Sequence, residues 1–207
     1  TVLKFNPITV DKCREDIINT MDVLFKNTLS YLSIKILYTA IMLYDFHISN
    51  NPNKVNELNY CILTYISSII LATSSNDFQN ILDVKKMFKD SICKNSKEER
   101  QLEKNLIVIT SKMYVEMNHS IYFQNIMGFT YALASEYDDI LSDPDINLIE
   151  RNYFLPLIKT GKLYDYNIDE VVYCCLALEG FNYISNKKFK YKNVPVKVFN
   201  FVLENRN

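Results

Sequence analysis

Histidine, cysteine and carboxylate side chains are the groups in this sequence that could do chemistry. The two histidines, His47 and His119, stand alone, and the motifs HEXXH, GXSXG and paired CXXC are absent. With only 3 glycines, a phosphate-binding loop built from glycine backbone is excluded. A solvated loop, or alternatively a divalent-metal site, would explain the run of carboxylates at Asp138, Asp139, Asp143 and Asp145. We interpret it as a loop and expect no enzyme activity, no cofactor and no metal.

The cysteines do not form a recognisable framework. They are odd in number and have no paired spacing: Cys13, Cys61, Cys93, Cys174 and Cys175. Cys61 and the Cys174–Cys175 pair fall inside apolar helical patterns, which is typical of reduced core thiols. We therefore expect a cytoplasmic or nuclear protein.

One long uncharged stretch stands out as the segment around which the other helices could pack. Residues 58–76 read LNYCILTYISSIILATSSN, in a chain that is 23% charged. The length approaches a membrane span, but the many hydroxyl and amide side chains argue against a hydrocarbon environment. Its larger apolar residues repeat at three- and four-residue steps, and its other face is small and uncharged. The pattern predicts a central helix wrapped by other helices, and no membrane partner.

Composition favours an all-α fold. Hydrophobic residues make up 48% of the chain, whereas only 3 Gly and 5 Pro are available for turns. The net charge of -1 argues against nucleic acid as a partner, because a basic stripe would be expected. The basic run KKFKYK at 187–192 is interpreted as a solvated connector.

Helical periodicity and cap signals divide the chain into segments. Ser96 and Glu99 have the spacing of a capping box, and Asp143-Pro144 is a helix start. Pro156 should kink or end the helix that follows. The expected helices span 10–32, 33–48, 58–76, 82–90 and 96–110 in the first half, then 120–137, 143 onward, 168–184 and 194–203.

Three of these segments resemble the cyclin box. ILYTAIMLYDFHIS at 36–49 is similar to its second helix, the uncharged run to its third, and SKEERQLEKNLIVI at 96–109 to its fifth. YVEMNHSIYFQNI at 114–126 resembles the exit from that helix in P-type cyclins. The resemblance implies a five-helix bundle around a buried central helix over residues 10–126. Residues 127–207 would form a shorter second helical pack, either an abbreviated repeat or accessory helices.

The resemblance also assigns roles to single residues. It implies an ion pair between Arg14 and Asp45, although Asp45 could instead point to water. The glutamate that contacts the kinase falls at Glu103, whose alternative is a surface pair with Lys104 or Arg100. Ser74 stands where cyclins carry the lysine that contacts the kinase, a departure that puts ordinary kinase binding in doubt. Asp77 matches an acidic residue near the end of the third cyclin-box helix. Leu63, Ile66 and Ile70 are expected to be core residues of that helix.

Taken together, the resemblance implies a non-catalytic regulatory subunit that binds and activates, or sequesters, a cyclin-dependent-type protein kinase. The partner surface would include Glu103, Ser74 and Asp77. Two alternatives remain open: a cyclin-fold transcription module resembling transcription factor IIB, and an all-helical viral adaptor of Bcl-2-like type.

Overall fold

The computed structural model describes residues 3–119, 125–136, 142–179 and 194–207. Every regular element in these ranges is helical and none is a strand, which confirms the all-α prediction. The chain divides into two compact units, Thr1–Phe123 and Gln124–Asn207. Each is described below by itself.

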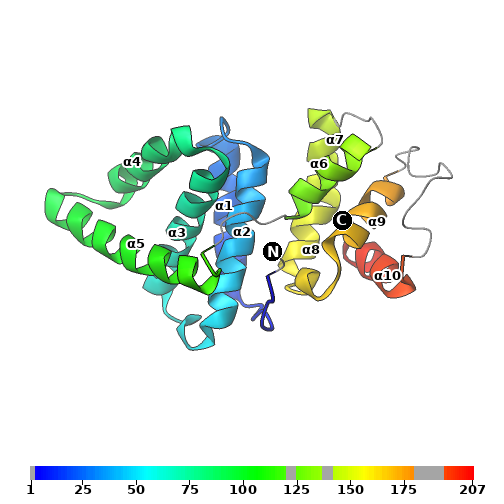
Figure 1. Cartoon of the computed structure of the whole chain (residues 1–207), viewed down its shortest axis with the longest axis horizontal. Helices are drawn as coiled ribbons and strands as arrows, with labels where there is room; N and C mark the ends of the chain where they lie inside the picture. Colours follow the sequence, from blue (N-terminus) through cyan, green and yellow to red (C-terminus); the bar gives the residue numbers. More distant parts are fainter. Residues whose placement is uncertain (1–2, 120–124, 137–141, 180–193) are drawn as a thin grey trace. The chain divides into compact units, whose positions relative to one another are not determined.

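The described residues of the first unit form five α-helices, coloured blue to green in Figure 1. They are α1 (Lys12–Asn27), α2 (Ile34–Asn50), α3 (Leu58–Asn76), α4 (Ile81–Ile92) and α5 (Ser96–Glu116). The predicted bounds of α3 are confirmed. α1 ends at Asn27, earlier than predicted, and Ser33 caps α2 by accepting from Lys35 N. α5 extends to Glu116, six residues beyond the predicted end at Thr110.

Helix α3 lies at the centre of this unit, since it packs against α1, α2, α4 and α5. It is also the one helix among the described residues that is long and apolar enough to cross a membrane, and most of that window is buried. The first turns are exposed, however, and Leu58 is 62% accessible. Burial is more complete along α2, where every residue from Ile36 to Ser49 is buried. The helix without charges is therefore not the most deeply buried one. Helix α2 can be buried more completely although it contains Asp45 and His47, because both side chains have bonded partners on other helices.

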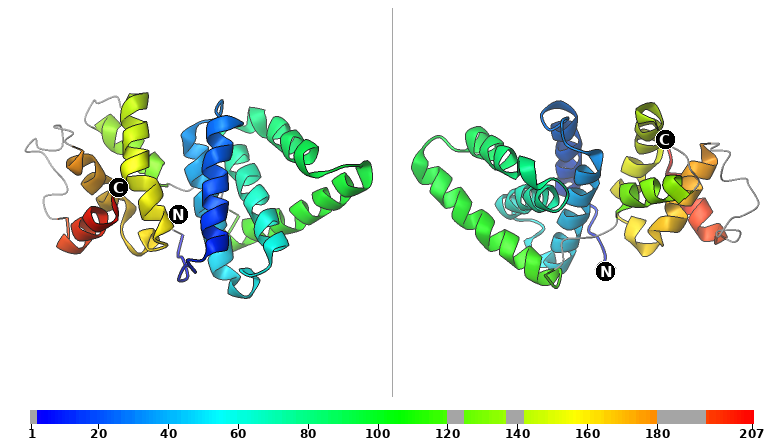
Figure 2. Two further views of the ribbon diagram at one scale, coloured as in Figure 1. Left: turned by 180° about the vertical axis from the view of Figure 1, so that it is seen from behind. Right: turned by 45° about the horizontal axis from the view of Figure 1, so that its top comes forward.

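Helices α4 and α5 diverge from a short connection at residues 93–95, and the first turns of α5 project beyond α3 (Figures 1 and 2). The predicted capping box at Ser96 and Glu99 is wrong by one residue. Asn95 is the cap, and its side-chain oxygen accepts from Lys97 N and Glu98 N. Glu98 accepts in return from Lys94 N at 2.8 Å. Asn and Ser are comparable N-caps, so composition alone could not choose between them.

The second unit is also helical where it is described. Its elements are α6 (Ile126–Glu136), α7 (Asp143–Ile149), a π-helical turn (Glu150–Phe154), α8 (Leu155–Lys159), α9 (Ile168–Leu178) and α10 (Val196–Asn205). α9 packs against α6 and α10. Residues 120–124, 137–141 and 180–193 lie outside the described residues. The start of the predicted helix 120–137, the predicted loop residues Asp138 and Asp139, and the KKFKYK connector all fall in these ranges.

Two local predictions in this unit are modified by the structure. The cap of α7 is Ser142, whose hydroxyl accepts from Asp145 N while Asp145 accepts from Ser142 N, rather than Asp143. Pro156 does not end its helix, and the π-helical turn lies directly before α8. Proline cannot donate to Asn152 O four residues earlier, and this carbonyl accepts instead from Asn207 N at 2.9 Å.

Candidate functional site

A buried ion pair fixes α1 against α2. Arg14 Nε donates to Asp45 Oδ1 at 2.8 Å, and a second guanidinium nitrogen donates to Oδ2 at 2.9 Å. The side chains are 2% and 1% exposed. A bidentate pair matches the planar guanidinium to the carboxylate and is the strong form of such contacts. The structure thus brings together the two residues that the resemblance paired, and Asp45 does not point to water.

A second polar cluster joins α2, α3 and α5 at the end of α5. His47 is completely buried, and its Nδ1 lies 2.6 Å from Glu116 Oε2. Its Nε2 lies 2.7 Å from the hydroxyl of Tyr60. Asn51 Nδ2 donates to the other Glu116 oxygen at 3.0 Å. Lys112 Nζ donates to Asn51 Oδ1 and lies 3.5 Å from the Tyr60 hydroxyl. We call these five residues the α5 latch.

Electrostatics assign a direction to the hydrogen bonds in the latch. Burial by itself raises the pKa of Glu116, but the hydrogen bonds from His47 and Asn51 and the nearby positive charges lower it on balance. The ionised carboxylate therefore accepts, and His47 Nδ1 donates. Burial, with the Glu116 charge second, raises the pKa of Tyr60 to about 12. Tyr60 consequently keeps its proton at neutral pH, and its hydroxyl is hydrogen-bonded to Nε2 of His47.

This order of carboxylate, imidazole and hydroxyl has the same sequence of groups as a catalytic relay. Its environment differs, because His47 is inaccessible to solvent and both of its ring nitrogens are already bonded within the protein. The raised pKa of Tyr60 also makes its hydroxyl a poor nucleophile at neutral pH. What the cluster does is hold three helices together at one end of α5.

Sequence reasoning missed the latch. A signal exists, since His47 and Asn51 are four residues apart on one helix and Lys112 and Glu116 are four apart on another. Such spacing places each pair on one helix face. Nothing in the sequence states that the two faces meet, because that depends on how α5 crosses α2.

Glu103, the predicted partner contact, is exposed on α5 and paired across to α4. Its carboxylate accepts from Lys89, and neither Lys104 nor Arg100 is the partner. The hydrogen bond from Lys89 and the positive charge there lower the pKa of Glu103, with Lys85 contributing further. Glu103 therefore lies close to two lysines of α4.

The other predicted partner residues lie near the end of α3. The Ser74 hydroxyl donates to Leu71 O of its own helix at 3.2 Å. Asp77 ends α3 and accepts from Asn80 Nδ2 at 2.7 Å. Among the described residues, no hydrogen bond or ion pair joins Glu103 to Ser74 or Asp77. The three predicted positions are thus not in direct contact.

The predicted core positions of α3 differ in burial. Ile66 is 1% exposed and Ile70 is 6% exposed, so both belong to the core. Leu63 is only half-buried, which corrects its assignment to the core. It lies on the first half of α3, where the helix is less covered.

Helix α5 carries an apolar stripe that faces solvent. Ile107, Val108 and Val115 are 65%, 66% and 59% exposed, and Tyr114 is partly exposed. Spacings of four and seven residues place Ile107 and Tyr114 on the same face as Glu103. On the opposite face, Leu102, Ile109 and Met113 are buried. α5 therefore packs against the rest of the unit on one face and exposes apolar side chains to solvent on the other.

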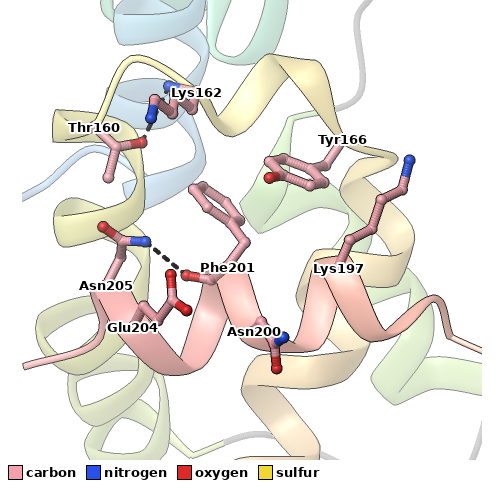
Figure 3. Close-up of a pocket in the computed structure, with 8 residues that line it drawn as sticks. All are labelled: Thr160, Lys162, Tyr166, Lys197, Asn200, Phe201, Glu204 and Asn205. Atoms are coloured by element: carbon pink, nitrogen blue, oxygen red, sulfur yellow. Dashed lines mark hydrogen bonds between the residues drawn. The ribbon is translucent and has the colours of Figure 1, made fainter.

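An open cavity of about 590 Å³ lies in the second unit, between α10 and the residues after α8 (Figure 3). Tyr166 and Phe201 stack in it with ring centroids 4.3 Å apart. Its charged residues are Lys162, Lys197 and Glu204, all exposed and of both signs. This lining does not select one class of ligand.

Metal-binding and disulfide chemistry find little support in the described ranges. Within them, no group of three or more histidine, cysteine or acidic side chains could hold a metal ion. Cys61, Cys174 and Cys175 are buried free thiols, and Cys13 and Cys93 are half-buried free thiols. Burial raises the pKa of Cys61 to about 11, so this thiol is mostly protonated at neutral pH.

Compared with protein-family models, curated proteins and solved structures, the chain matches none.

Proposed function

We propose that this protein is a cyclin-like regulatory subunit that binds a protein kinase through the solvent-exposed face of α5. The observation that carries the proposal is the apolar stripe formed by Ile107, Val108, Tyr114 and Val115, with Glu103 beside it. It is exposed on a helix whose opposite face is packed. Exposed apolar patches of this kind mark interaction sites on soluble proteins.

The helices that support this face favour a rigid docking surface over a mobile one. The α5 latch fixes the last turns of the helix to α2 and α3 through His47, Tyr60 and Glu116. The Arg14–Asp45 pair joins α1 to α2, the helix to which the latch is bonded. A preformed surface loses less entropy on binding, so more of the contact energy becomes affinity. This is what a subunit that positions another protein requires.

The proposed mechanism places the chemistry in the partner. A kinase becomes active when its own Lys–Glu pair and metal ligands are assembled, and a subunit that binds the assembled state shifts the population toward it. The resemblance to the cyclin box over residues 10–126 supports this class of partner. The Arg14–Asp45 contact supports the resemblance, because it joins two positions that the resemblance pairs.

Replacement of the expected lysine by Ser74 changes what the surface can offer a kinase. The Ser74 hydroxyl is bonded to its own helix, so it supplies no cation. Lys89 on α4 contacts Glu103 instead. In the proposed complex the positive charge beside Glu103 therefore comes from α4.

Affinity purification with mass spectrometry tests the proposal. Tagged wild-type protein should recover a kinase catalytic subunit from a lysate, and Ile107→Glu should lose it by placing a charge in the apolar contact. The matched control is Val23→Glu, an exposed apolar residue of α1 that is 55% accessible. Recovery of no kinase, or equal recovery by the Ile107 and Val23 variants, would contradict the proposal.

A further inference from the structure

The solvent-exposed face of α5 is basic as well as apolar. Lys97, Arg100 and Lys104 are exposed, and spacings of three and four residues place them on the face that continues into Ile107 and Val108. The cations occupy the first half of α5 and the apolar residues the second. One continuous strip therefore changes from charged to hydrophobic along a single helix.

Helix α4 adds to the positive charge. Lys89 pairs with Glu103, and Lys85 also lies within electrostatic range of that carboxylate. Glu98, the other nearby acid of the first turn, accepts from Lys94 N and from the side-chain amide of Asn95. In the first half of α5, Glu98, Glu99 and Glu103 balance Lys97, Arg100 and Lys104 in number, so the positive surplus of the face comes from Lys85 and Lys89 of α4.

This surplus is local, because the whole chain has a net charge of -1. Surfaces that bind proteins are complementary in potential to their partners, which gives specificity and faster association. The strip runs from Lys97 to Val115 on α5, about 27 Å at the rise of an α-helix. Its length therefore suits a partner helix of several turns.

We propose that the α4–α5 face binds an acidic amphipathic helix of a partner protein. The apolar side of that helix would cover Ile107, Val108 and Val115, and its carboxylates would meet Lys85, Lys104 and their neighbours. This inference deepens the proposed function. It rests on that function in one respect only, namely that the partner is a protein. It names the chemistry of the segment that is bound, whether or not that segment belongs to a kinase.

An anionic membrane fits the face less well. Helices that lie in a membrane surface insert bulky Trp, Phe or Leu side chains, whereas this stripe offers Ile107, Val108, Val115 and one tyrosine. Glu103 also lies within it, where lipid headgroups of like charge would repel it. A partner helix can instead place a small or basic residue opposite Glu103.

Fluorescence anisotropy with designed peptides tests this inference. The probe is a labelled amphipathic peptide of about 20 residues, long enough to form a helix, with leucines on one face and glutamates on its flanks. A second peptide has every glutamate replaced by lysine, and a third has the composition of the first without its periodicity. The full-length protein should bind the first peptide best, and more weakly at about 300 mM than at about 50 mM salt.

Variants of the protein locate the binding face. Ile107→Ser should weaken binding of the acidic peptide about tenfold, the loss of roughly one buried aliphatic contact. Lys104→Glu should weaken it several-fold and reduce its salt dependence. The matched controls, Val23→Ser and Lys12→Glu on α1, should bind like wild type.

Specific outcomes would overturn the inference. They are equal or tighter binding of the lysine peptide, equal binding of the peptide without periodicity, and equal losses in the α1 controls. Binding of anionic lipid vesicles or duplex DNA in place of the acidic peptide would also overturn it. Binding of the acidic peptide at this face without recovery of a kinase from lysate would refute the proposed function and support this inference.

Discussion

Breaking the Arg14–Asp45 pair should destabilise the first unit strongly. Both side chains are almost fully buried and joined by two hydrogen bonds, so Asp45→Asn leaves a guanidinium in the interior without its counter-charge. Removing one member of a buried pair costs about 3–5 kcal/mol of unfolding free energy. Arg14→Met should cost a similar amount, because it strands the carboxylate.

Replacing both partners should cost much less than either single change. In Arg14→Met/Asp45→Leu no charge remains to be desolvated, and apolar side chains of similar volume can fill the space. We expect the double variant to lie within about 1 kcal/mol of wild type, giving a large coupling energy in a double-mutant cycle. The matched control on α1 is Lys26→Met, which breaks an exposed pair with Asp22 and should change stability by about 0.5 kcal/mol or less.

The assay must resolve the first unit from the second, because the two could unfold separately. Urea unfolding followed by circular dichroism gives the overall transition, and hydrogen exchange of peptides from α1 and α2 gives the local free energy. A loss of less than about 1 kcal/mol in Asp45→Asn would refute the view that this buried pair holds α1 to α2. A double variant as unstable as the single ones would refute the electrostatic explanation.

Three further predictions concern the latch and a helix cap. Tyr60→Phe should cost about 1–3 kcal/mol in urea unfolding, because Nε2 of the buried His47 loses its hydrogen-bond partner. Asn95→Ala should cost about 1 kcal/mol and Ser96→Ala only a few tenths, since Asn95 is the cap of α5. Glu116 has a folded-state pKa below its ordinary value of 4.5, so its ionisation stabilises the protein above that value. The stability difference between wild type and Glu116→Gln should therefore be largest near neutral pH and shrink as the pH falls through the lowered pKa.

Each of these has a control and a contradicting result. Tyr114→Phe changes an exposed ring and should be nearly neutral, so an equal loss there would argue against the latch. If Ser96→Ala costs more than Asn95→Ala, the cap is at Ser96. A difference between wild type and Glu116→Gln that stays constant from neutral pH to well below 4.5 would show that the carboxylate's charge does not stabilise the fold.

The sequence predicted what depends on residues near one another in the chain. Apolar periodicity gave the all-α class and the bounds of α3, because a helix positions its side chains every 3.6 residues. Cap positions were less certain, since Asn95 and Ser96 are both acceptable caps and differ by one residue. The pairing of Arg14 with Asp45 came from the resemblance to cyclins and not from the spacing of the residues.

Only the tertiary structure decided which distant groups meet. The absence of charge in α3 predicted a central helix, and α3 does pack against α1, α2, α4 and α5. Yet α2 is more completely buried, because Asp45 and His47 have partners on other helices. The latch needs α5 to cross α2 and α3 at one point, and the exposure of Ile107 depends on which face of α5 is packed. Local sequence determines the faces of each helix, whereas the crossing of helices determines which faces meet and which remain in solvent.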